Sequence, residues 1–404
     1  MINKRTREKK IELISGVGNF PSLKAACDAG ADAVYFGIKG LNMRDFGKNF
    51  TIKELPNVAK FCHERGVKCY LALNTIVYDK ELNLVKRILK RAKKAKVDAV
   101  ICSDFAVLKE AKKLRLPIHV STQMSISNSE SAEFVRKLGA KRVVLARELS
   151  LEQIKEIKKK SKIEIELFIH GSLCISVSGR CYLSLYFHDK SANRGKCTNP
   201  CRRVWYLEGE EKEGKRAEIY GNRIISSKDL WTLPFFDKII KMKPSGLKIE
   251  GRNKGPDYTY ITTKTYREAL DLAMKNKLSA KEKERLEAQV STVFNRGFFS
   301  GFYLRTPDYA DIQTSNKSQR TSKLKCIGRV KHFYSKQSVA EINADIDFNV
   351  GKEIIVQGKT TYFRQEFKSV EVKHKQVKKV KQGEDVGIKV KEKVRKGDLI
   401  YIVD

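Results

Sequence analysis

Acidic residues are scarce in this 404-residue sequence: 47 Asp and Glu stand against 82 Lys and Arg, which gives a formal charge of +35. A high lysine content can reflect adaptation to heat, but that adaptation normally brings glutamate with it. The shortage of acids therefore favours a polyanionic partner, most often a nucleic acid. Proline is also rare, with eight residues, while 41% of the chain is hydrophobic, and this composition excludes a disordered chain.

Long apolar runs are absent as well. No stretch approaches the roughly 18 apolar residues that a membrane-spanning helix needs, so we expect no membrane partner. The N-terminal MINKRTREKKIELIS is basic, but no long apolar run follows it, unlike in a signal peptide. We therefore expect a cytoplasmic protein whose nine cysteines are reduced thiols or metal ligands rather than disulfides.

The usual motifs of peptidases are missing. The chain has six histidines, but neither an H-E-x-x-H zinc motif nor a G-x-S-x-G elbow. A cysteine peptidase that uses Cys174 with His170 remains conceivable. It would leave three neighbouring cysteines without a role, so we rank it below a metal-dependent enzyme.

The sequence does contain a cluster of four cysteines within residues 164–205, and this stretch is here called the cysteine segment. Cys174, Cys181, Cys197 and Cys201 are spaced C-x6-C-x15-C-x3-C and follow an apolar run that predicts a buried strand. A thiol-rich loop at the end of a strand suits a soft metal or an iron–sulfur cluster. Structural zinc sites pair cysteines at C-x2–4-C spacing, which only Cys197 and Cys201 meet. The spacing leaves zinc and iron–sulfur open and disfavours four ordinary buried thiols.

Most of the chain alternates short apolar strands with helical patterns. Strands are predicted at Ile11–Ser15, Ala33–Gly37, Lys68–Leu73, Ala99–Cys102, Ile118–Ser121, Arg142–Ala146, Ile163–Ile169 and Leu247–Ile249. Strands that are apolar throughout suit a parallel sheet buried on both faces. Eight strand–helix units over about 260 residues match an α/β fold of the (β/α)8 TIM-like type. A doubly wound sheet is the alternative, but no glycine-rich dinucleotide loop accompanies it.

The domain organisation follows from this pattern. We expect residues 1–310 to form the TIM-like catalytic domain, with the four-cysteine insertion at 170–245. Residues 311–323 are polar and read as a linker. Residues 324–404 show short strands and turns. The stretch Gly383–Val403 resembles the β-barrel domain of translation factors, in which V-x-x-G-D-x-I-Y is the closing hairpin. From residue 321 on, 19 Lys and Arg face 11 Asp and Glu, so this small all-β barrel is basic too.

In a TIM barrel, the residues just past each strand meet at one mouth, where active sites lie. Here they are Gly16, Gly18, Asn19, Asn74, Ser103, Asp104, Gln123, Arg147, Glu148, His170, Glu250 and Arg252. Polar groups of this kind have little place in a core, so their convergence predicts a catalytic site. The structural alternative stays open for each of them: Arg147 and Glu148, for example, would pair with each other at the rim.

Several strings in this sequence resemble the signature of peptidase family U-32, the collagenase-like proteins. The pattern E-x-F-x-H-G-S-x-C-x6-C begins at Glu166, and N-R-G-x-C-x3-C-R runs from Asn193 to Arg202. STQ at Ser121, RELS at Arg147 and LKIEGR at Leu247 are also similar to the family. The resemblance covers nearly the whole chain.

The resemblance implies a chemistry that the family name does not suggest. The best-understood relatives are oxygen-independent hydroxylases of RNA bases or of quinone precursors, with a 4Fe–4S cluster and with prephenate as the hydroxyl source. By this resemblance, Cys174, Cys181, Cys197 and Cys201 hold such a cluster rather than zinc. Arg147 and Arg252 are then suited to anchor the dicarboxylate donor, and Glu148, His170 and Glu250 to transfer protons.

The expected function is an oxygen-independent tRNA hydroxylase that converts uridine at the wobble position into 5-hydroxyuridine. Its expected partners are tRNA, a prephenate-like dicarboxylate and an unidentified electron donor. The alternatives are an rRNA-base or quinone-precursor hydroxylase of the same family, a collagenase-like peptidase, and an RNA-binding protein whose cluster is only structural.

Overall fold

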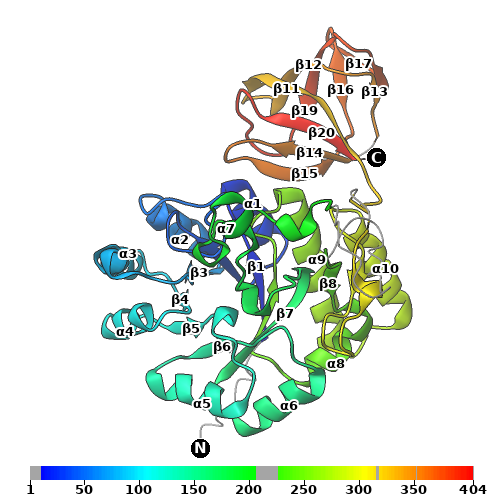
Figure 1. The fold of residues 1–404 in the computed structure, drawn as a ribbon. Helices are drawn as coiled ribbons and strands as arrows, with labels where there is room; N and C mark the ends of the chain where they lie inside the picture. Colours follow the sequence, from blue (N-terminus) through cyan, green and yellow to red (C-terminus); the bar gives the residue numbers. More distant parts are fainter. Residues whose placement is uncertain (1–10, 206–225, 315–317, 352, 404) are drawn as a thin grey trace, which may run out of the picture.

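The computed structural model describes residues 11–205, 226–314, 318–351 and 353–403. Within them, parallel strands close into a TIM-like barrel, as the sequence predicts (Figure 1). Its strands are β1 (Glu12–Gly16), β2 (Ala33–Gly37), β3 (Lys68–Leu73), β4 (Ala99–Cys102), β5 (Ile118–Val120), β6 (Arg142–Val144), β7 (Glu164–Ser172) and β9 (Gly246–Ile249). Strand β9 closes the barrel because it pairs in parallel with both β1 and β7.

Two short strands extend this sheet and were not predicted. Strand β8 (Asp229–Trp231) pairs antiparallel with the far end of β7, where His170 lies opposite Trp231. Strand β10 (Phe298–Phe299) then pairs in parallel with β8. The nearby Tyr303 hydroxyl donates to the Phe168 carbonyl at 2.6 Å, so the aromatic stretch around residues 295–304 packs onto the barrel.

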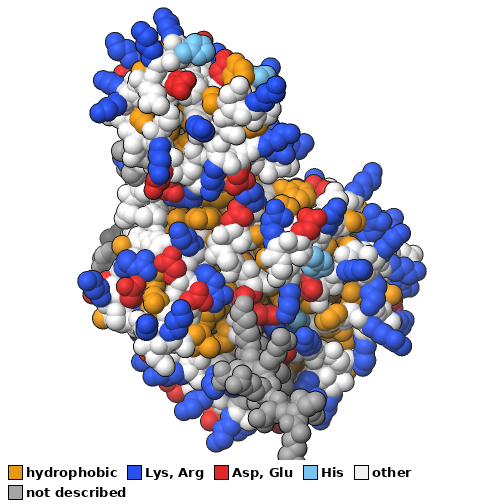
Figure 2. Space-filling view, turned by 180° about the vertical axis from the view of Figure 1, so that it is seen from behind, with side chains coloured by type: hydrophobic (Ala, Val, Ile, Leu, Met, Phe, Trp, Pro, Cys, Tyr) orange, Lys and Arg blue, Asp and Glu red, His pale blue; other side chains and the backbone are white. Residues whose placement is uncertain are grey.

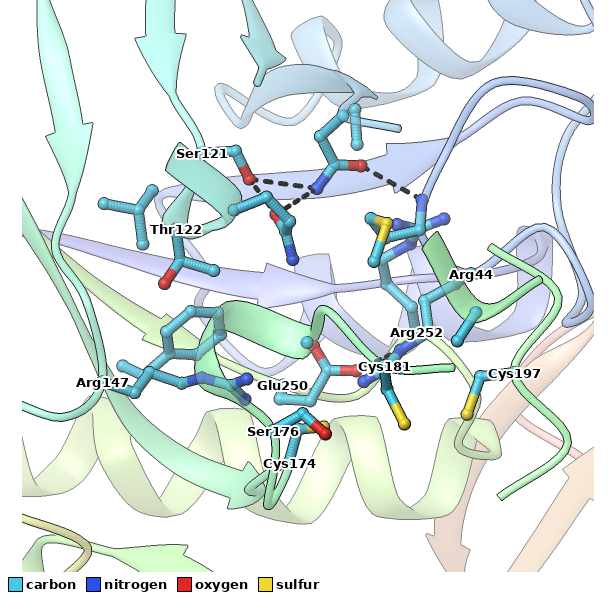
Figure 3. A pocket seen from close by; sticks show the side chains of 18 of the residues that line it. Arg44, Ser121, Thr122, Arg147, Cys174, Ser176, Cys181, Cys197, Glu250 and Arg252 are labelled. Atoms are coloured by element: carbon cyan, nitrogen blue, oxygen red, sulfur yellow. Dashed lines mark hydrogen bonds and ion pairs between the residues drawn. The ribbon is translucent and has the colours of Figure 1, made fainter. Parts of the chain in front are cut away.

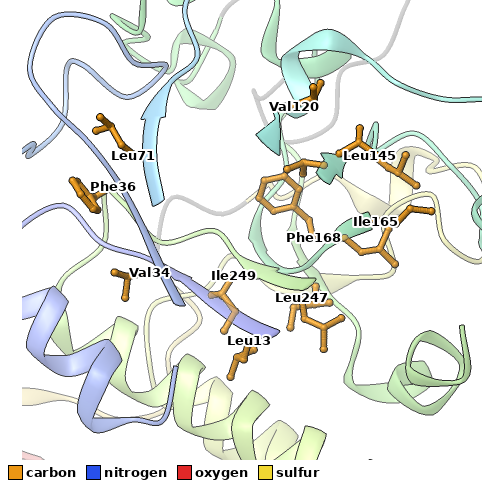
Figure 4. Packing of buried hydrophobic residues seen from close by; sticks show 14 of the residues in the cluster. Leu13, Val34, Phe36, Leu71, Val120, Leu145, Ile165, Phe168, Leu247 and Ile249 are labelled. Atoms are coloured by element: carbon orange, nitrogen blue, oxygen red, sulfur yellow. The ribbon is translucent and has the colours of Figure 1, made fainter. Parts of the chain in front are cut away.

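Helices surround the barrel because each presents one apolar stripe to the strands. They are α1 (Phe20–Asp28), α2 (Leu55–His63), α3 (Leu82–Lys94), α4 (Phe105–Lys113), α5 (Ser129–Leu138), α6 (Leu151–Lys160), α8 (Phe236–Lys241), α9 (Pro256–Met274) and α10 (Ala280–Ser291). In α3, for example, Val85, Ile88 and Leu89 are buried against the sheet while the lysines and arginines between them are exposed. The main core lies in this layer between strands and helices, where Leu13 and Phe36 pack (Figure 4). No helix of the described residues is both long and apolar enough to cross a membrane.

The inside of the barrel is unusually polar. Lys248 Nζ lies 2.7 Å from Glu166 Oε1, and both side chains are almost fully buried. Arg142 Nη1 lies 2.7 Å from Glu12 Oε2 and 3.4 Å from Glu166 Oε2. Branched apolar side chains usually fill a TIM barrel, so this chain of charges is a departure from the common pattern.

The C-terminal part is an antiparallel all-β structure with its own hydrophobic core, again as predicted for the fold class. Its strands are β11 (Leu324–Tyr334), β12 (Val339–Ala344), β13 (Phe348–Asn349), β14 (Glu353–Gln357), β15 (Tyr362–Glu366), β16 (Val370–Val372), β17 (Lys375–Gln376), β18 (Lys379–Val380), β19 (Asp385–Lys389) and β20 (Leu399–Val403). It stands on α1 and α9 (Figure 1), with Ile355 and Tyr362 packed on Ala25. Arg364 Nη1 also lies 2.7 Å from Asp257 Oδ1 of α9.

Candidate active site at the mouth of the barrel

All four cysteines of the cysteine segment line one pocket at the C-terminal mouth of the barrel. Cys174, Cys181 and Cys197 are labelled in Figure 3. Side chains from several strand ends line the pocket as well, and its volume is about 90 Å³. They include Tyr35, Arg44, Asn74, Ser121, Gln123, Arg147, Phe168, Lys248, Glu250 and Arg252. This inner pocket is therefore where the cysteine segment and the strand ends meet.

The cysteine segment folds over the mouth because both of its ends are tied down. It leaves β7 at Gly171, whose φ of +106° is one that other residues rarely adopt. Arg202 Nη2 donates to the Leu173 carbonyl at 2.9 Å, and Nη1 donates to the Ser227 carbonyl at 2.9 Å. Between the two ends lie α7 (Leu183–His188) and the short turns η3 (Val177–Gly179), η4 (Ala192–Arg194) and η5 (Pro200–Arg202).

Gly195 brings the cysteine segment against the loop that follows β2. A Cβ on Gly195 would lie only 2.0 Å from the Asn42 carbonyl oxygen, and its φ is +78°. The Phe46 amide donates to the Gly195 carbonyl at 3.0 Å. Only glycine meets both demands, so the N-R-G of the signature has a structural reason.

The four thiols are partly exposed. Burial raises the pKa of the Cys201 thiol to about 11, while Arg202 acts in the opposite direction. Among the residues that the structure describes, no three of these Sγ atoms lie within 4.8 Å of one another. One tetrahedral zinc with Zn–S bonds of about 2.3 Å would hold its sulfurs about 3.8 Å apart. A single zinc ion would therefore require the thiols to lie closer together than they do in this structure.

Glu250 is the central acid of the inner pocket. Its Oε2 accepts from the Tyr35 hydroxyl at 2.8 Å, and its Oε1 accepts from Arg44 Nε at 3.2 Å. Burial by itself would raise the pKa of Glu250, but Arg44 and the Tyr35 hydroxyl lower it below its ordinary value. The side chain is therefore a carboxylate at neutral pH.

Arg147 and Arg252, the two predicted anchors, differ in how they are held. Arg147 lies with its guanidinium carbon 5.7 Å from the Phe168 ring centre, and its Nε is buried without a partner among the described residues. Arg252 Nη2 donates to Asn42 Oδ1 and, at 2.9 Å, to Asn49 Oδ1. Arg147 is thus available to an anion, whereas Arg252 also holds the loop after β2. Burial lowers the pKa of Arg252 to about 10, so it stays charged.

Glu148 and His170 do not line the inner pocket. Glu148 Oε1 accepts from the Ser178 amide at 3.2 Å and supports the cysteine segment, and no ion pair joins it to Arg147 in the described part of the chain. The His170 ring packs among Tyr258, Tyr266 and Phe298. Burial there lowers the pKa of His170 to about 4. Its ring therefore faces α9 rather than Cys174, the pairing that a cysteine peptidase needs.

Other mouth residues divide into structural and pocket-lining ones. Asn19 and Asp104 accept backbone amides at the starts of α1 and α4, so both are helix caps. Asn74 and Gln123 line the pocket, as predicted.

The sequence reasoning missed three pocket residues, Tyr35, Arg44 and Lys248. For Lys248 a signal existed, because a lysine inside an apolar strand must point to a buried partner. Arg44 lies on a loop and Tyr35 lies mid-strand, and for these two the pattern held no comparable signal.

The chain is similar over most of its length to known proteins of one family. Residues 18–313 match the model of peptidase family U32. The chain is 42% identical to an uncharacterized protease of Methanocaldococcus jannaschii, over 97% of this chain and 98% of that protein. It is 37% identical to a collagenase of Porphyromonas gingivalis, over 97% and 98%. It is also 32% identical to tRNA hydroxylation protein P1 of Bacillus subtilis, over 87% and 84%.

Proposed function

The chain belongs to peptidase family U32, and on that premise we propose that it is an oxygen-independent tRNA hydroxylase that converts uridine at the wobble position into 5-hydroxyuridine. The observation that carries the proposal is the inner pocket. It joins four thiols, the unpartnered Nε of Arg147 and the ionised Glu250 at the mouth of a barrel. A relative at 32% identity is named as a tRNA hydroxylation protein, which supports the substrate class.

The charge of the molecule supports an RNA substrate. The chain carries a formal charge of +35. Lys and Arg side chains are spread over both the barrel and the C-terminal part on the face drawn in Figure 2. Such a surface attracts phosphate backbones without reading their sequence. The choice of base must then be made at the pocket.

We propose further that Cys174, Cys181, Cys197 and Cys201 hold a 4Fe–4S cluster. Four thiols on one segment are the usual ligand set of such a cluster, and one zinc ion would require them to move closer together. When bound, the cluster supplies electron transfer. The protein residues around it provide the rest: Arg202 ties down the segment, and Gly195 seats it against the loop after β2.

The hydroxyl donor in this proposal is a dicarboxylate such as prephenate. The Nε atoms of Arg147 and Arg252 both lack a partner among the described residues, but Arg252 Nη2 already donates to Asn42 and Asn49. Arg147 is therefore the better-placed group for a carboxylate, which a guanidinium can bind through two parallel bonds. A volume of about 90 Å³ suits the reacting end of the donor rather than a whole ligand, since ligand pockets usually measure about 300–1,000 Å³. Glu250, fixed by Tyr35 and Arg44, is the proposed proton acceptor.

Nucleoside analysis tests the activity. We expect tRNA from a deletion strain to lack 5-hydroxyuridine, with or without oxygen, and the wild-type gene to restore it. Arg147→Ala should not restore it although the protein keeps its metal, while Arg65→Ala, an exposed arginine on the outside of the barrel, should. Unchanged tRNA nucleosides, together with cleavage of gelatin that Cys174→Ala abolishes, would establish the peptidase instead.

Metal analysis tests the cofactor separately. Protein purified without oxygen should be brown and contain about four irons and four sulfides per chain. Cys181→Ser should lose the colour and the iron, whereas Cys326→Ser on β11 should keep both. A colourless protein with one zinc that depends on the same four cysteines would refute the cluster.

A further inference from the structure

A second, more open cavity lies beside the inner pocket, and the proposed chemistry has given it no role so far. Its volume is about 460 Å³, within the range of about 300–1,000 Å³ that is common for small-molecule sites. Met43, Asn74 and Gln123 line both spaces, so the two adjoin at these side chains. A group held in this outer cavity would border the inner pocket.

The hydrogen bonds around Gln123, which borders both spaces, fix which end of its amide is left without a partner. The Met43 backbone amide can only donate, and it donates to Asn74 Oδ1 at 3.2 Å. Asn74 Nδ2 must therefore be the donor toward Gln123 Oε1 at 2.9 Å and toward Ser121 Oγ at 3.0 Å. The Ser121 hydroxyl donates to Gln123 Oε1 as well. Nε2 of Gln123 has no acceptor in the described part of the chain, so it is a donor of fixed polarity.

Gln123 is also held in place by its backbone. It lies in the short turn η2 (Thr122–Met124), and its carbonyl accepts from Arg180 Nη2 at 2.7 Å. The Ser125 hydroxyl, just after this turn, lies 2.7 Å from the Ser178 hydroxyl. Both contacts come from the cysteine segment, so Gln123 is locked to the part of the chain that carries the thiols. A donor held this rigidly can discriminate between ligands.

Two of the remaining walls of the outer cavity, Ile76 and Tyr182, suit the flat face of a ligand, while Thr75, Ser103, Asp104, Arg180 and Asn193 add polar groups. The Tyr182 side chain lines the outer cavity and is 73% exposed, although it directly follows Cys181. Ile76, also in the lining, is 49% exposed. Exposed aromatic side chains beside a basic residue such as Arg180 are typical platforms for an unpaired base.

We propose that the outer cavity receives the target base of an unpaired nucleotide, and that Gln123 Nε2 selects uridine over cytidine. The proposal rests on the proposed function, and it names the group that chooses the base. Uracil carries a carbonyl oxygen at C4, which accepts a hydrogen bond, whereas cytosine carries an amino group there, which donates one. The fixed Gln123 Nε2 donates to the C4 oxygen of uracil. With cytosine, the amino group at C4 and Gln123 Nε2 are both donors and cannot form a hydrogen bond. Tyr182 stacks on the face of the base.

The test is the ratio of two affinities. Two short single-stranded RNAs, identical except for one uridine or cytidine among purines, are titrated against the metal-loaded protein without a hydroxyl donor. The wild type should bind the uridine RNA about tenfold more tightly. Gln123→Glu keeps an acceptor for Asn74 and Ser121 but turns the free donor into an acceptor, so the ratio should fall to one or invert. Gln153→Glu, the same change at the capping box of α6, should keep the wild-type ratio.

Each outcome decides something different. A wild type without preference, or a Gln123→Glu variant that keeps the preference, overturns the assignment of Gln123 even if the tRNA contains 5-hydroxyuridine. Tyr182→Ala should lower the affinity for both RNAs by the same factor. An unchanged affinity would show that Tyr182 does not stack on the base. Absence of any hydroxylated nucleoside refutes the proposed function, whatever the ratio.

Discussion

The charged side chains inside the barrel connect its two ends. From the bottom, Lys68 contacts Glu12, Glu12 contacts Arg142, and Arg142 contacts Glu166, which is shared with Lys248 beside the pocket. Buried pairs of this kind add little to stability compared with apolar packing, but breaking one leaves an isolated charge in a low dielectric. The stability therefore depends on keeping each buried charge beside its partner rather than on how many ion pairs there are.

Glu166→Gln tests this point. The substitution removes the anion that Lys248 and Arg142 share, and it should lower the free energy of unfolding by about 3 kcal/mol. Lys60→Met breaks the exposed Lys60–Glu64 pair and should change the free energy of unfolding by less than about 1 kcal/mol. Denaturant unfolding of the three proteins gives both values, and equal effects would show that the interior network is as weak as a surface pair.

His170 gives the stability a defined pH dependence. Burial lowers its pKa from 6.5 to about 4, so between these values the unfolded chain binds the proton and the folded chain does not. This contribution is complete above about pH 6.5 and is lost as the pH falls to about 4, by up to about 3 kcal/mol. His119 is also buried, with a lowered pKa, and has the same sign. His170→Gln should therefore lose stability less steeply between pH 7 and pH 4.5; an unchanged slope would contradict the burial argument.

The candidate residues that line the inner pocket carry a signal that does not depend on the fold. Cysteines at metal-ligand spacing and polar groups at strand ends belong to this class, and the cysteines, Arg147 and Glu250 all line the inner pocket. Tyr35 and His170 show what the sequence pattern does not predict. In a strand that is buried on both faces, the pattern does not say which side chains point into the barrel and which toward the helices, so His170 was predicted to be at the mouth but packs under α9.

At the scale of elements, the barrel strands were predictable to within a few residues because each is a continuous apolar run. Strands β8 and β10 were missed because they have three and two residues and lie in connections without alternation. The cysteine segment has little regular structure, so its fold is set by single contacts such as Gly195 against Asn42. Contacts of that kind leave no periodic trace in a sequence.

Gly195→Ala should therefore unseat the segment. The added Cβ would lie 2.0 Å from the Asn42 oxygen at a φ of +78°, and we expect a loss of about 1–3 kcal/mol in stability together with reduced iron content after anaerobic purification. Gly40→Ala is the matched control, since its φ is +108° but no atom lies within 4 Å of the new Cβ. It should cost only the backbone strain and keep its metal. Equal iron contents would show that the close approach is not needed.

At the scale of the whole molecule, the proposed function gives the excess of positive charge the role of holding RNA. The C-terminal part contributes exposed lysines such as Lys373, Lys375 and Lys379. If each neutralises one phosphate, changing all three to Glu should lower the slope of log affinity against log salt by about 0.9 per contact, or roughly 3. Changing Lys155, Lys159 and Lys162, exposed on or just after α6, alters the net charge equally and should leave most of the slope. Equal losses would mean that only net charge matters.

The position of β9 in the barrel has a consequence for how the protein is made. This strand lies between β7 and β1 and leads directly to Glu250 and Arg252, yet it follows Cys201, the last of the four clustered cysteines, by about 45 residues. At about 5–20 residues per second, a ribosome exposes all four thiols for several seconds before the sheet can close. During that interval β1 and β7 are open edges, which other chains can join. A nascent chain that stops before residue 246 therefore has two open strand edges and is prone to aggregate rather than to form a smaller enzyme. Its four thiols stay exposed until β9 is made and the barrel closes.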